Sequence, residues 1–398
     1  MSRRVAGVPP KVSQRSAVDP FIVMDVMRAA GDYARRSVAE NLPDVVHLEV
    51  GQPSTPAPRL ARAAAAAALE AGPLGYTDAL GLLDLRRRIA RHYAESYDFD
   101  LDWQRIAVTT GSSGGFLLAF LAAFDPGDRV ALACPGYPCY RHILSVLGIE
   151  PVLIETQPET KFQPTPQLLH PFAGKIDGLI VASPSNPVGA MVSPQELEAL
   201  ARWCDAHGVR LISDEIYHGI SYGVKAATAA SFSDHAIVVN SFSKYFSMTG
   251  WRLGWLALPP ELVRPVERLA QNLFISPPAV SQTAGLGAFD ATEELDANVR
   301  RYADNRALLL EELPKAGFAH LTVPDGAFYI YADVQEFTAD SLDFSKRMLA
   351  ETGIAATPGL DFDPARGSHF MRFSFAGSTP DMAEAARRLK AWHNKARR

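Results

Sequence analysis

The sequence predicts an α/β protein with a large, mostly parallel sheet and a second, smaller α+β part. Two observations predict this architecture. Short apolar runs alternate with helical stretches through the middle of the chain, and the pattern changes after about residue 277, where long helices and alternating strands take over. Strands that alternate with helices in this way are typical of parallel sheets whose faces are covered by helices.

The large sheet is predicted from six short apolar segments. The run at 176–182 is almost continuously apolar, as expected for a strand that is buried on both faces. A helix is predicted at 194–207, because Ser193 is a good N-cap and Pro194 suits a first helical position. The six predicted strands are residues 105–109, 129–134, 176–182, 209–212, 236–239 and 253–258.

The smaller part is predicted from both ends of the chain. An arm and a helix come first, and a short strand then runs from Val45 to the turn Gly51-Gln52-Pro53. The end of the chain shows helical patterns at 295–313 and 381–395, with half-buried strands at 326–334 and 370–375. The predicted organisation is an N-terminal arm with part of the small domain, a large cofactor-binding domain and a C-terminal small domain, at residues 1–50, 51–290 and 291–398.

Charge and cysteine content limit the partners and the compartment. The 398 residues include 39 Lys and Arg against 44 Asp and Glu, a net charge of −5, whereas nucleic-acid binders usually carry a strongly basic surface. Only 3 cysteines are present, which argues against a disulfide framework and for a reducing compartment. The apolar run 63–68 is too short to cross a membrane, and the N-terminus has no apolar leader core. We therefore expect a cytoplasmic protein that binds neither nucleic acid nor membrane and carries no metal.

Ligands of parallel sheets bind at the carboxyl ends of the strands, so the residues that follow each strand are the first candidates for a site. Thr110 to Gly115 follows one strand and opens a helix, and its glycines, hydroxyls and free N–H groups suit a phosphate. The segment Ser241 to Lys244 follows another strand. A lysine there can form a Schiff base if its amine is neutral, and burial or a nearby cation such as Arg252 lowers a lysine pKa.

Two further strand ends add an acid, a phenol and an amide. Asp214 can hold a protonated pyridine nitrogen, and Tyr217 can donate to a phenolic oxygen. Asn186 lies in the turn Pro184 to Gly189, after the third strand. Each segment alone is as easily an ordinary turn, helix cap or surface lysine. Together they offer every group that pyridoxal phosphate needs: phosphate donors, an acid for the ring nitrogen and a Schiff-base lysine.

These motifs identify a family resemblance that runs from about Val45 to the C-terminus. The chain resembles the class I aminotransferases of pyridoxal phosphate fold type I, the group of aspartate, alanine and aromatic aminotransferases. The most specific marker is Ser241-Phe242-Ser243-Lys244 followed by Gly250-x-Arg252-x-Gly254. The resemblance implies a large domain with a seven-stranded sheet, a small domain from both chain ends, and a homodimer.

The resemblance also implies a role for each site residue. Lys244 would form the Schiff base and move the proton, Asp214 would keep the ring nitrogen protonated, and Tyr217 would bind the 3-oxygen. Tyr76 would reach the phosphate of the partner subunit's site. The remaining implied cofactor contacts are Ser112, Ser113, Gly114, Tyr137 (stacked on the ring), Asn186, Ser241, Ser243 and Arg252, and the implied substrate contacts are Gly51, Asn186 and Arg372.

The expected reaction moves an amino group between an L-amino acid and a 2-oxo acid in two half-reactions. A β-lyase on the same scaffold stays open, because it would use the same cofactor motifs. A cofactor-sensing regulator is a distant alternative, since such proteins carry an extra basic DNA-binding domain and about 44 residues precede Val45 here. The apolar segment Pro20 to Met27 is expected to line the entrance, which favours neutral or aromatic substrate side chains.

Overall fold

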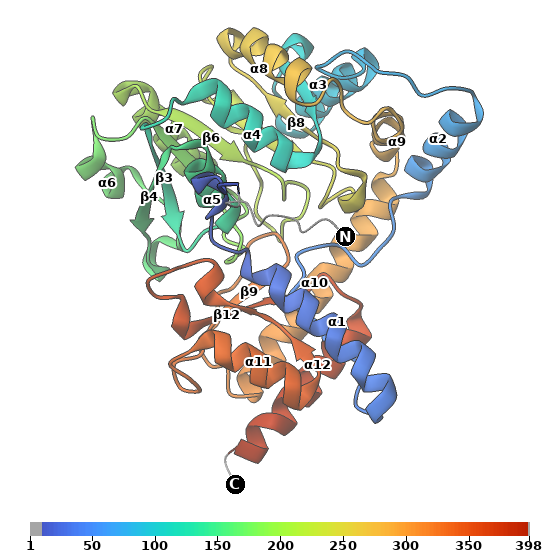
Figure 1. The fold of residues 1–398 in the computed structure, drawn as a ribbon, viewed down its shortest axis with the longest axis vertical. Coiled ribbons are helices and arrows are strands. Elements are labelled where there is room, and N and C mark those ends of the chain that lie inside the picture. Colours follow the sequence, from blue (N-terminus) through green and yellow to red (C-terminus); the bar gives the residue numbers. More distant parts are fainter. Residues whose placement is uncertain (1–9, 397–398) are drawn as a thin grey trace, which may run out of the picture.

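A computed structural model describes residues 10–396 as two bodies built around separate sheets (Figure 1). The predicted segment 1–50 therefore begins, and the segment 291–398 ends, outside the described residues. The larger body holds a seven-stranded sheet in the order β2-β8-β7-β6-β5-β3-β4, in which only β8 runs antiparallel to its neighbours. Its strands are β2 (Ile106–Thr109), β3 (Arg129–Cys134), β4 (Glu150–Glu155), β5 (Gly178–Ala182), β6 (Arg210–Asp214), β7 (Ile237–Ser241) and β8 (Gly254–Ala257).

The structure confirms the predicted α/β class and the six apolar strands. The seventh strand, β4, lies at the edge of the sheet and gives a weaker signal in the sequence. It contains Pro151, which an edge strand tolerates because one side of its backbone needs no partner. Its side chains also alternate between buried and exposed instead of forming an apolar run.

Helices cover both faces of this sheet, because alternate strand residues point to opposite sides. Ile106 and Val108 pack with α3 and α9 in one core, whereas Ala107 packs with Phe116 and Phe120 of α4 in the other. The helices of the larger body are α2 (Arg59–Glu70), α3 (Leu83–Tyr97), α4 (Gly111–Ala123), α5 (Pro138–Leu147), α6 (Pro166–Leu169), α7 (Pro194–His207), α8 (Pro260–Leu273) and α9 (Ala279–Ala288).

Local sequence explains where these helices begin and end. Ser193 and Glu196 form a capping box at the start of α7, and Gly208 ends that helix in a left-handed conformation with φ of 67°. Helix α4 begins at Gly111, whose φ of 73° is one that residues other than glycine rarely reach. The glycine-rich segment is thus the first turn of α4, and it lies at the edge where β2 and β7 end.

The smaller body combines both ends of the chain. Its antiparallel sheet has the order β11-β12-β9, and β1 pairs in parallel with β10 beside it. Helix α1 packs Val26, Ala30 and Tyr33 against Leu349 and Ala355. The elements are α1 (Ile22–Glu40), β1 (Val46–His47), α10 (Thr292–Lys315), β9 (Tyr329–Asp333), α11 (Ser341–Thr352), β10 (Ile354–Ala355), β11 (Thr357–Pro358), β12 (Phe370–Ser374) and α12 (Thr379–Ala396).

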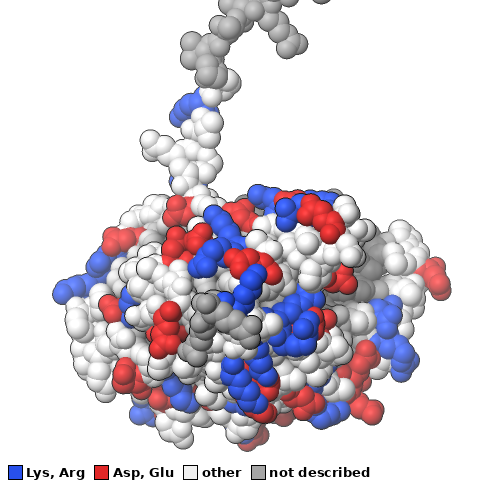
Figure 2. Space-filling view, turned by 90° about the horizontal axis from the view of Figure 1, so that it is seen from below, with Lys and Arg blue, Asp and Glu red and all other residues white. Residues whose placement is uncertain are grey.

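Charges of both signs are mixed over the surface. Figure 2 shows acidic and basic side chains interspersed on one face, without a broad patch of one sign. Many of them form pairs one helical turn apart, such as Arg202 with Glu198 and Arg347 with Asp343. Within residues 10–396, no helix is both long and apolar enough to span a bilayer.

Candidate active site

A cavity of about 640 Å³ lies at the carboxyl ends of β5, β6 and β7, between the two bodies. Volumes of this order are typical of small-molecule sites. It brings together most of the residues that the sequence predicted from separate strand ends. The predicted residues that line it are Gly51, Ser112, Ser113, Tyr137, Asn186, Asp214, Tyr217, Ser243, Lys244, Arg252 and Arg372.

Three predicted site residues do not line this cavity. Ser241 is 1% exposed and lies behind Ser243, which does line the cavity. The Ser241 hydroxyl donates to Ser243 Oγ at 2.9 Å. Gly114 is buried in the first turn of α4, where a Cβ would lie 2.4 Å from Thr110 Oγ1. Tyr76 is 86% exposed on the connection between α2 and α3, so its side chain does not lie in the cavity of its own chain.

Lys244 lies just beyond the end of β7, with its amine inside the cavity. The Nζ donates to the carbonyl oxygen of Gly51, across the boundary between the two bodies. Burial, together with the nearby cations Arg372 and Arg252, lowers the lysine pKa to about 8 against the opposing effect of Asp214. A substantial fraction of this amine is therefore neutral near pH 8 and able to attack a carbonyl.

Asp214 is the last residue of β6 and is only 3% exposed. Burial raises its pKa to about 6, while hydrogen bonds from Tyr140 and the Ile216 N–H and the charge of Lys244 hold it down. Tyr140 donates its hydroxyl to Oδ2, and the Ile216 N–H donates to Oδ1 at 3.1 Å. The carboxylate thus has a fixed orientation and a charge that a cation in the cavity can share.

Tyr217 and Asn186 supply neutral polar groups to the same cavity. Burial raises the pKa of Tyr217 well above the usual tyrosine value, so its hydroxyl keeps its proton. That hydroxyl lies 2.6 Å from the hydroxyl of Tyr329. Asn186 points its Oδ1 towards Arg372, whose Nη1 donates to it at 2.8 Å, so the amide NH₂ is the end that remains for another partner.

A candidate anion site lies at the first turn of α4, beside Arg252. The N-cap residue Thr110 gives no side-chain hydrogen bond to that turn, so its N–H groups are open to a ligand. The side chain of Arg252 is exposed, and its Nη1 donates to the Thr249 carbonyl at 3.0 Å. The backbone of Arg252 is left-handed, with a φ of 51°. A Cβ on Gly111 would lie 2.4 Å from Arg252 Nη2, so only glycine lets the guanidinium approach the helix start.

Arg372 lies on β12 and reaches the cavity from the smaller body. It is 2% exposed, and its Nη2 donates to the Glu49 carbonyl and, at 3.2 Å, to Thr357 Oγ1. Its Nε has no hydrogen-bond partner among the described residues. A buried guanidinium that is only partly paired is a strong site for a carboxylate, which can accept two parallel hydrogen bonds.

Sequence reasoning assigned no role to two tyrosines that line the cavity. Tyr140 lies in α5, three residues after Tyr137, the N-cap residue of that helix, and this short spacing was the available signal that both face one site. Tyr329 begins β9, and the sequence predicted no function for it. Its contact with Tyr217 depends on how β9 packs against the larger body, and no local pattern shows that.

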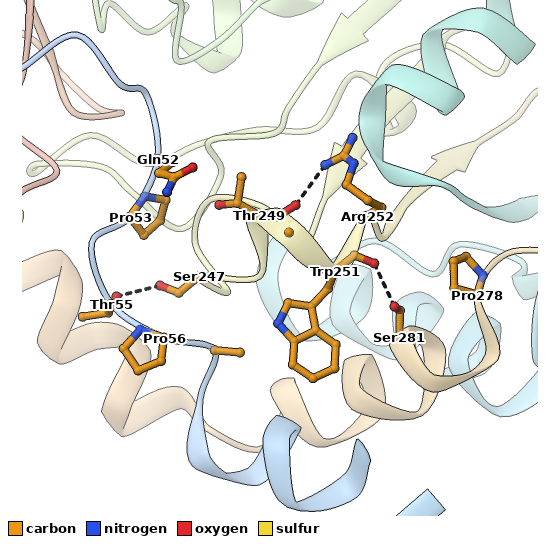
Figure 3. A pocket seen from close by; sticks show the side chains of 12 residues that line it. Gln52, Pro53, Thr55, Pro56, Ser247, Thr249, Trp251, Arg252, Pro278 and Ser281 are labelled. Carbon is orange, nitrogen blue, oxygen red and sulfur yellow. Dashed lines mark hydrogen bonds between the residues drawn. The ribbon is translucent and has the colours of Figure 1, made fainter. Parts of the chain in front are cut away.

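A second, open depression of about 580 Å³ adjoins the anion site (Figure 3). It shares Gln52, Thr249, Gly250 and Arg252 with the main cavity, and it opens towards the surface between α9 and the segment after β1. Its walls are held by hydrogen bonds between Thr55 and Ser247 at 3.1 Å and from Ser281 to the Trp251 carbonyl at 2.8 Å. The end of the cavity beside Arg252 is therefore accessible from outside the chain.

The donor set fits the cofactor that the sequence implies. An aromatic phosphate ester with a carbonyl needs an anion site, a buried acid and a neutral amine in one cavity. The structure provides these as the open turn of α4 with Arg252, Asp214 and Lys244. The partly paired guanidinium of Arg372 keeps a free donor that suits a carboxylate.

Comparison with known proteins agrees with this arrangement. Residues 43–389 match the family described as aminotransferase class I and II. The valine–pyruvate aminotransferase of Mycobacterium tuberculosis is 52% identical over 96% of this chain and 98% of its own length. The aspartate aminotransferase of Sulfurisphaera tokodaii is 32% identical over 87% of this chain and 89% of its own.

Solved structures give the same answer. The crystal structure of an aminotransferase from Mycobacterium tuberculosis superposes with a TM-score of 0.94 at 52% identity, covering 97% of this chain and 100% of that one. The aspartate aminotransferase from Thermus thermophilus with maleate gives a TM-score of 0.90 at 30% identity, with 96% and 100% covered. Both the sequence and the fold of this chain are thus similar to aminotransferases over nearly its whole length.

Proposed function

Because this chain belongs to the class I and II aminotransferases, which are pyridoxal phosphate-dependent enzymes, we propose that the cavity around Lys244 is where it moves amino groups. The reaction exchanges an amino group between an amino acid and a 2-oxo acid. The observation that carries the assignment is that Lys244, Asp214 and Arg372 line one cavity. They come from three separate places: just after β7, the end of β6, and β12.

Lys244 is proposed to hold the cofactor and then to move the proton. The bound cofactor supplies the carbonyl that takes up the amino group and a ring that accepts electrons. With the cofactor bound and its own amine free, Lys244 would take the proton from the substrate α-carbon and pass it to the carbon that receives the nitrogen. The pKa of about 8 suits this task, since a base works best when its pKa lies near the working pH.

The other residues are proposed to orient the ring and the phosphate. Asp214 keeps the ring nitrogen protonated, Tyr137 stacks on the ring, and Tyr217 and Asn186 donate to the 3-oxygen. Burial of Asp214 and Tyr217 supports this part, because fixed dipoles in a dry site stabilise developing charge without reorganising. The residues proposed to hold the phosphate are Ser112, Ser113, Gly114, Ser241, Ser243 and Arg252, of which Ser241 and Gly114 act by shaping the site.

Arg372 is proposed to bind the α-carboxylate of the substrate, with Gly51 and Asn186 beside it. No further cation remains for a second carboxylate among the described residues that line the cavity, since Lys244 and Arg252 serve the cofactor. Apolar side chains of α1, Met24 and Met27, line the same cavity. We therefore propose a neutral amino donor, and the name of the 52% identical relative supports valine and pyruvate as the pair.

Half-reactions with single amino acids test this proposal. Purified enzyme loaded with cofactor is mixed with valine, phenylalanine, aspartate or glutamate, and the absorbance change and the 2-oxo acid are measured. We expect valine to react with at least about tenfold higher kcat/KM than either acidic amino acid, because one unpaired buried carboxylate costs more than 1.4 kcal/mol. Release of ammonia from a single substrate would instead indicate a lyase.

A cytoplasmic homodimer is proposed as the working form. Tyr76 is exposed and does not line the cavity of its own chain, whereas the depression beside Arg252 is open to another molecule. We propose that the partner subunit fills this depression and brings its own Tyr76 loop to the phosphate.

The cytoplasmic location is supported by the three free cysteines. Domain limits of 1–50, 51–290 and 291–398 remain part of the same proposal.

A further inference from the structure

Tyr329 is a buried side chain that contacts both the cofactor end and the substrate end of the cavity. It begins β9, is 1% exposed and lines the cavity. Its hydroxyl oxygen lies 2.6 Å from that of Tyr217, and its ring centre lies 4.4 Å from the guanidinium carbon of Arg372. One side chain therefore touches the proposed donor to the 3-oxygen and the proposed clamp for the carboxylate.

The hydroxyl pair has a definite direction once the site is in use. Burial raises the pKa of both tyrosines, so each hydroxyl carries one proton. If the Tyr217 hydroxyl donates its hydrogen bond to the 3-oxygen, the hydrogen bond between the two hydroxyls must be donated by Tyr329. Donation from Tyr329 then polarises the O–H of Tyr217 and strengthens the hydrogen bond that it makes in turn, as in other hydrogen-bond chains.

The ring of Tyr329 restrains Arg372 in a second way. The guanidinium carbon lies 4.4 Å from the Tyr329 ring and 4.8 Å from the Phe362 ring. Aromatic faces attract a guanidinium and keep its plane fixed. Hydrogen bonds to Asn186 and to the Glu49 carbonyl fix the plane at its edge, so the group reaches a carboxylate in one orientation.

Gly51 makes room for this arrangement. A Cβ on Gly51 would lie 2.0 Å from the Tyr329 hydroxyl oxygen, closer than any real contact. The same residue gives its carbonyl to Lys244. The absence of a side chain at position 51 is therefore what lets the Tyr329 hydroxyl reach Tyr217.

We propose that Tyr329 is a positioning residue with two separable tasks: its hydroxyl strengthens the donation by Tyr217, and its ring orients Arg372 for the substrate carboxylate. The proposal rests on the roles given above to Tyr217 and Arg372. The hydroxyl is therefore expected to affect the ionisation of the bound cofactor, and the ring is expected to affect the affinity for the substrate.

The first test replaces Tyr329 by Phe and uses Tyr331→Phe as the matched control. Tyr331 lies two residues along β9, is also 1% exposed, and its hydroxyl has no hydrogen-bond partner among the described residues. Absorbance of the bound cofactor is titrated against pH. In Tyr329→Phe we expect the midpoint to rise by about 0.2 to 0.7 pH units, because a weaker donor stabilises the ionised 3-oxygen less. Tyr331→Phe should match the wild type.

A double-mutant cycle tests whether the hydroxyl acts through Tyr217. Tyr217→Phe should raise the midpoint by more than Tyr329→Phe does, and the double variant should match Tyr217→Phe. Additive shifts, no shift in Tyr329→Phe, or an equal shift in Tyr331→Phe would each overturn this part of the proposal. The absorbance titration does not require transamination. Failure of the proposed function and failure of the proposed role of the Tyr329 hydroxyl can therefore be told apart.

The second task is tested by Tyr329→Leu, which removes the ring. Compared with Tyr329→Phe, it should raise KM for the amino acid about tenfold, since a desolvated cation–π contact is of this size. Tyr329→Phe should keep the KM of the wild type within about twofold, and cofactor-free protein should show by circular dichroism that each variant folds. An unchanged KM in folded Tyr329→Leu, or an equal rise in Tyr329→Phe, overturns the ring's role.

Discussion

The two ends of the proposed cofactor cavity are built in opposite ways. At the ring end, Asp214 and Tyr217 are each 3% exposed, and each already has a tyrosine hydroxyl as a partner within the chain. At the phosphate end, Arg252 and Ser113 are exposed, and the first turn of α4 has no side-chain cap. The ring end is thus buried and paired, while the phosphate end keeps exposed donors on Arg252, Ser113 and the first turn of α4.

This difference separates two kinds of work. The buried end shifts the pKa values of its groups, lowering that of Lys244 to about 8 and raising that of Asp214 to about 6. Such shifts control proton transfer and charge in the transition state. The open end supplies donors for an anion and so should mainly govern affinity. Substitutions at the ring end should therefore reduce turnover, and those at the phosphate end should release cofactor.

The largest effect is expected from Lys244→Ala at the ring end. Turnover should fall by about 10⁴-fold or more, because the variant loses both the covalent attachment and the proton-transferring base. The purified protein should also lack the pH-dependent visible band. Lys161→Ala is the control, since Lys161 forms a surface ion pair with Asp325. An unchanged spectrum in Lys244→Ala would contradict the whole assignment.

The next effect is expected from Asp214→Asn, with Glu215→Gln as its matched control. The two acids are neighbours and both buried, but Glu215 is bonded to Ser213, Thr228 and the Ala229 N–H, away from the cavity. Burial raises the pKa of Glu215 to about 8, so glutamine resembles the form that the site prefers. Asp214→Asn should lower kcat by about 10² to 10⁴-fold, and Glu215→Gln by less than about threefold. Equal losses in steady-state kinetics would mean that burial, not position, gives Asp214 its role.

The sequence predicts the residues that directly follow the strands better than the side-chain pairs that those residues form. Glycines and hydroxyls after a strand, such as Gly111 and Ser112, indicate a phosphate turn because the turn itself imposes them. Lys244, Asp214 and Asn186 were found in the same way, from their places after apolar runs. The mostly parallel sheet was equally readable, since strands buried on both faces are almost continuously apolar.

The pairs at the buried end are the part that sequence reasoning could not reach. Tyr140 with Asp214 and Tyr217 with Tyr329 join residues 74 and 112 positions apart, so no local period reports them. A buried tyrosine reads as ordinary core until a partner for its hydroxyl is known. The edge strand β4 was missed for a related reason, because exposure on one side weakens the apolar pattern.

At the open end, Arg252→Ala should weaken cofactor binding about 10- to 100-fold while kcat at saturating cofactor changes less than about threefold. Loss of one charge-assisted fork to a phosphate is of this size. Equilibrium titration of cofactor-free enzyme measures the change, and Arg252→Lys should be intermediate because it keeps the charge without the fork. A collapse of kcat with unchanged affinity would show that the two ends are not separate.

The smallest effect is a pH dependence that arises at Lys244, at the ring end, and that the charge of Arg252 adjusts from the other end. Covalent attachment of the cofactor needs the neutral amine of Lys244, and burial with two nearby cations lowers the pKa of that amine to about 8 instead of its ordinary 10.5. A lowered pKa means that the folded protein favours the neutral form, so the attachment rate should rise about tenfold per pH unit below pH 8 and level off above it. Stopped-flow absorbance with cofactor-free enzyme measures this rate. In Arg252→Ala the midpoint should rise to a pH between about 8 and the ordinary lysine value, since one of the two cations is gone. A wild-type rate that still rises at pH 10 would show that the site does not hold Lys244 neutral.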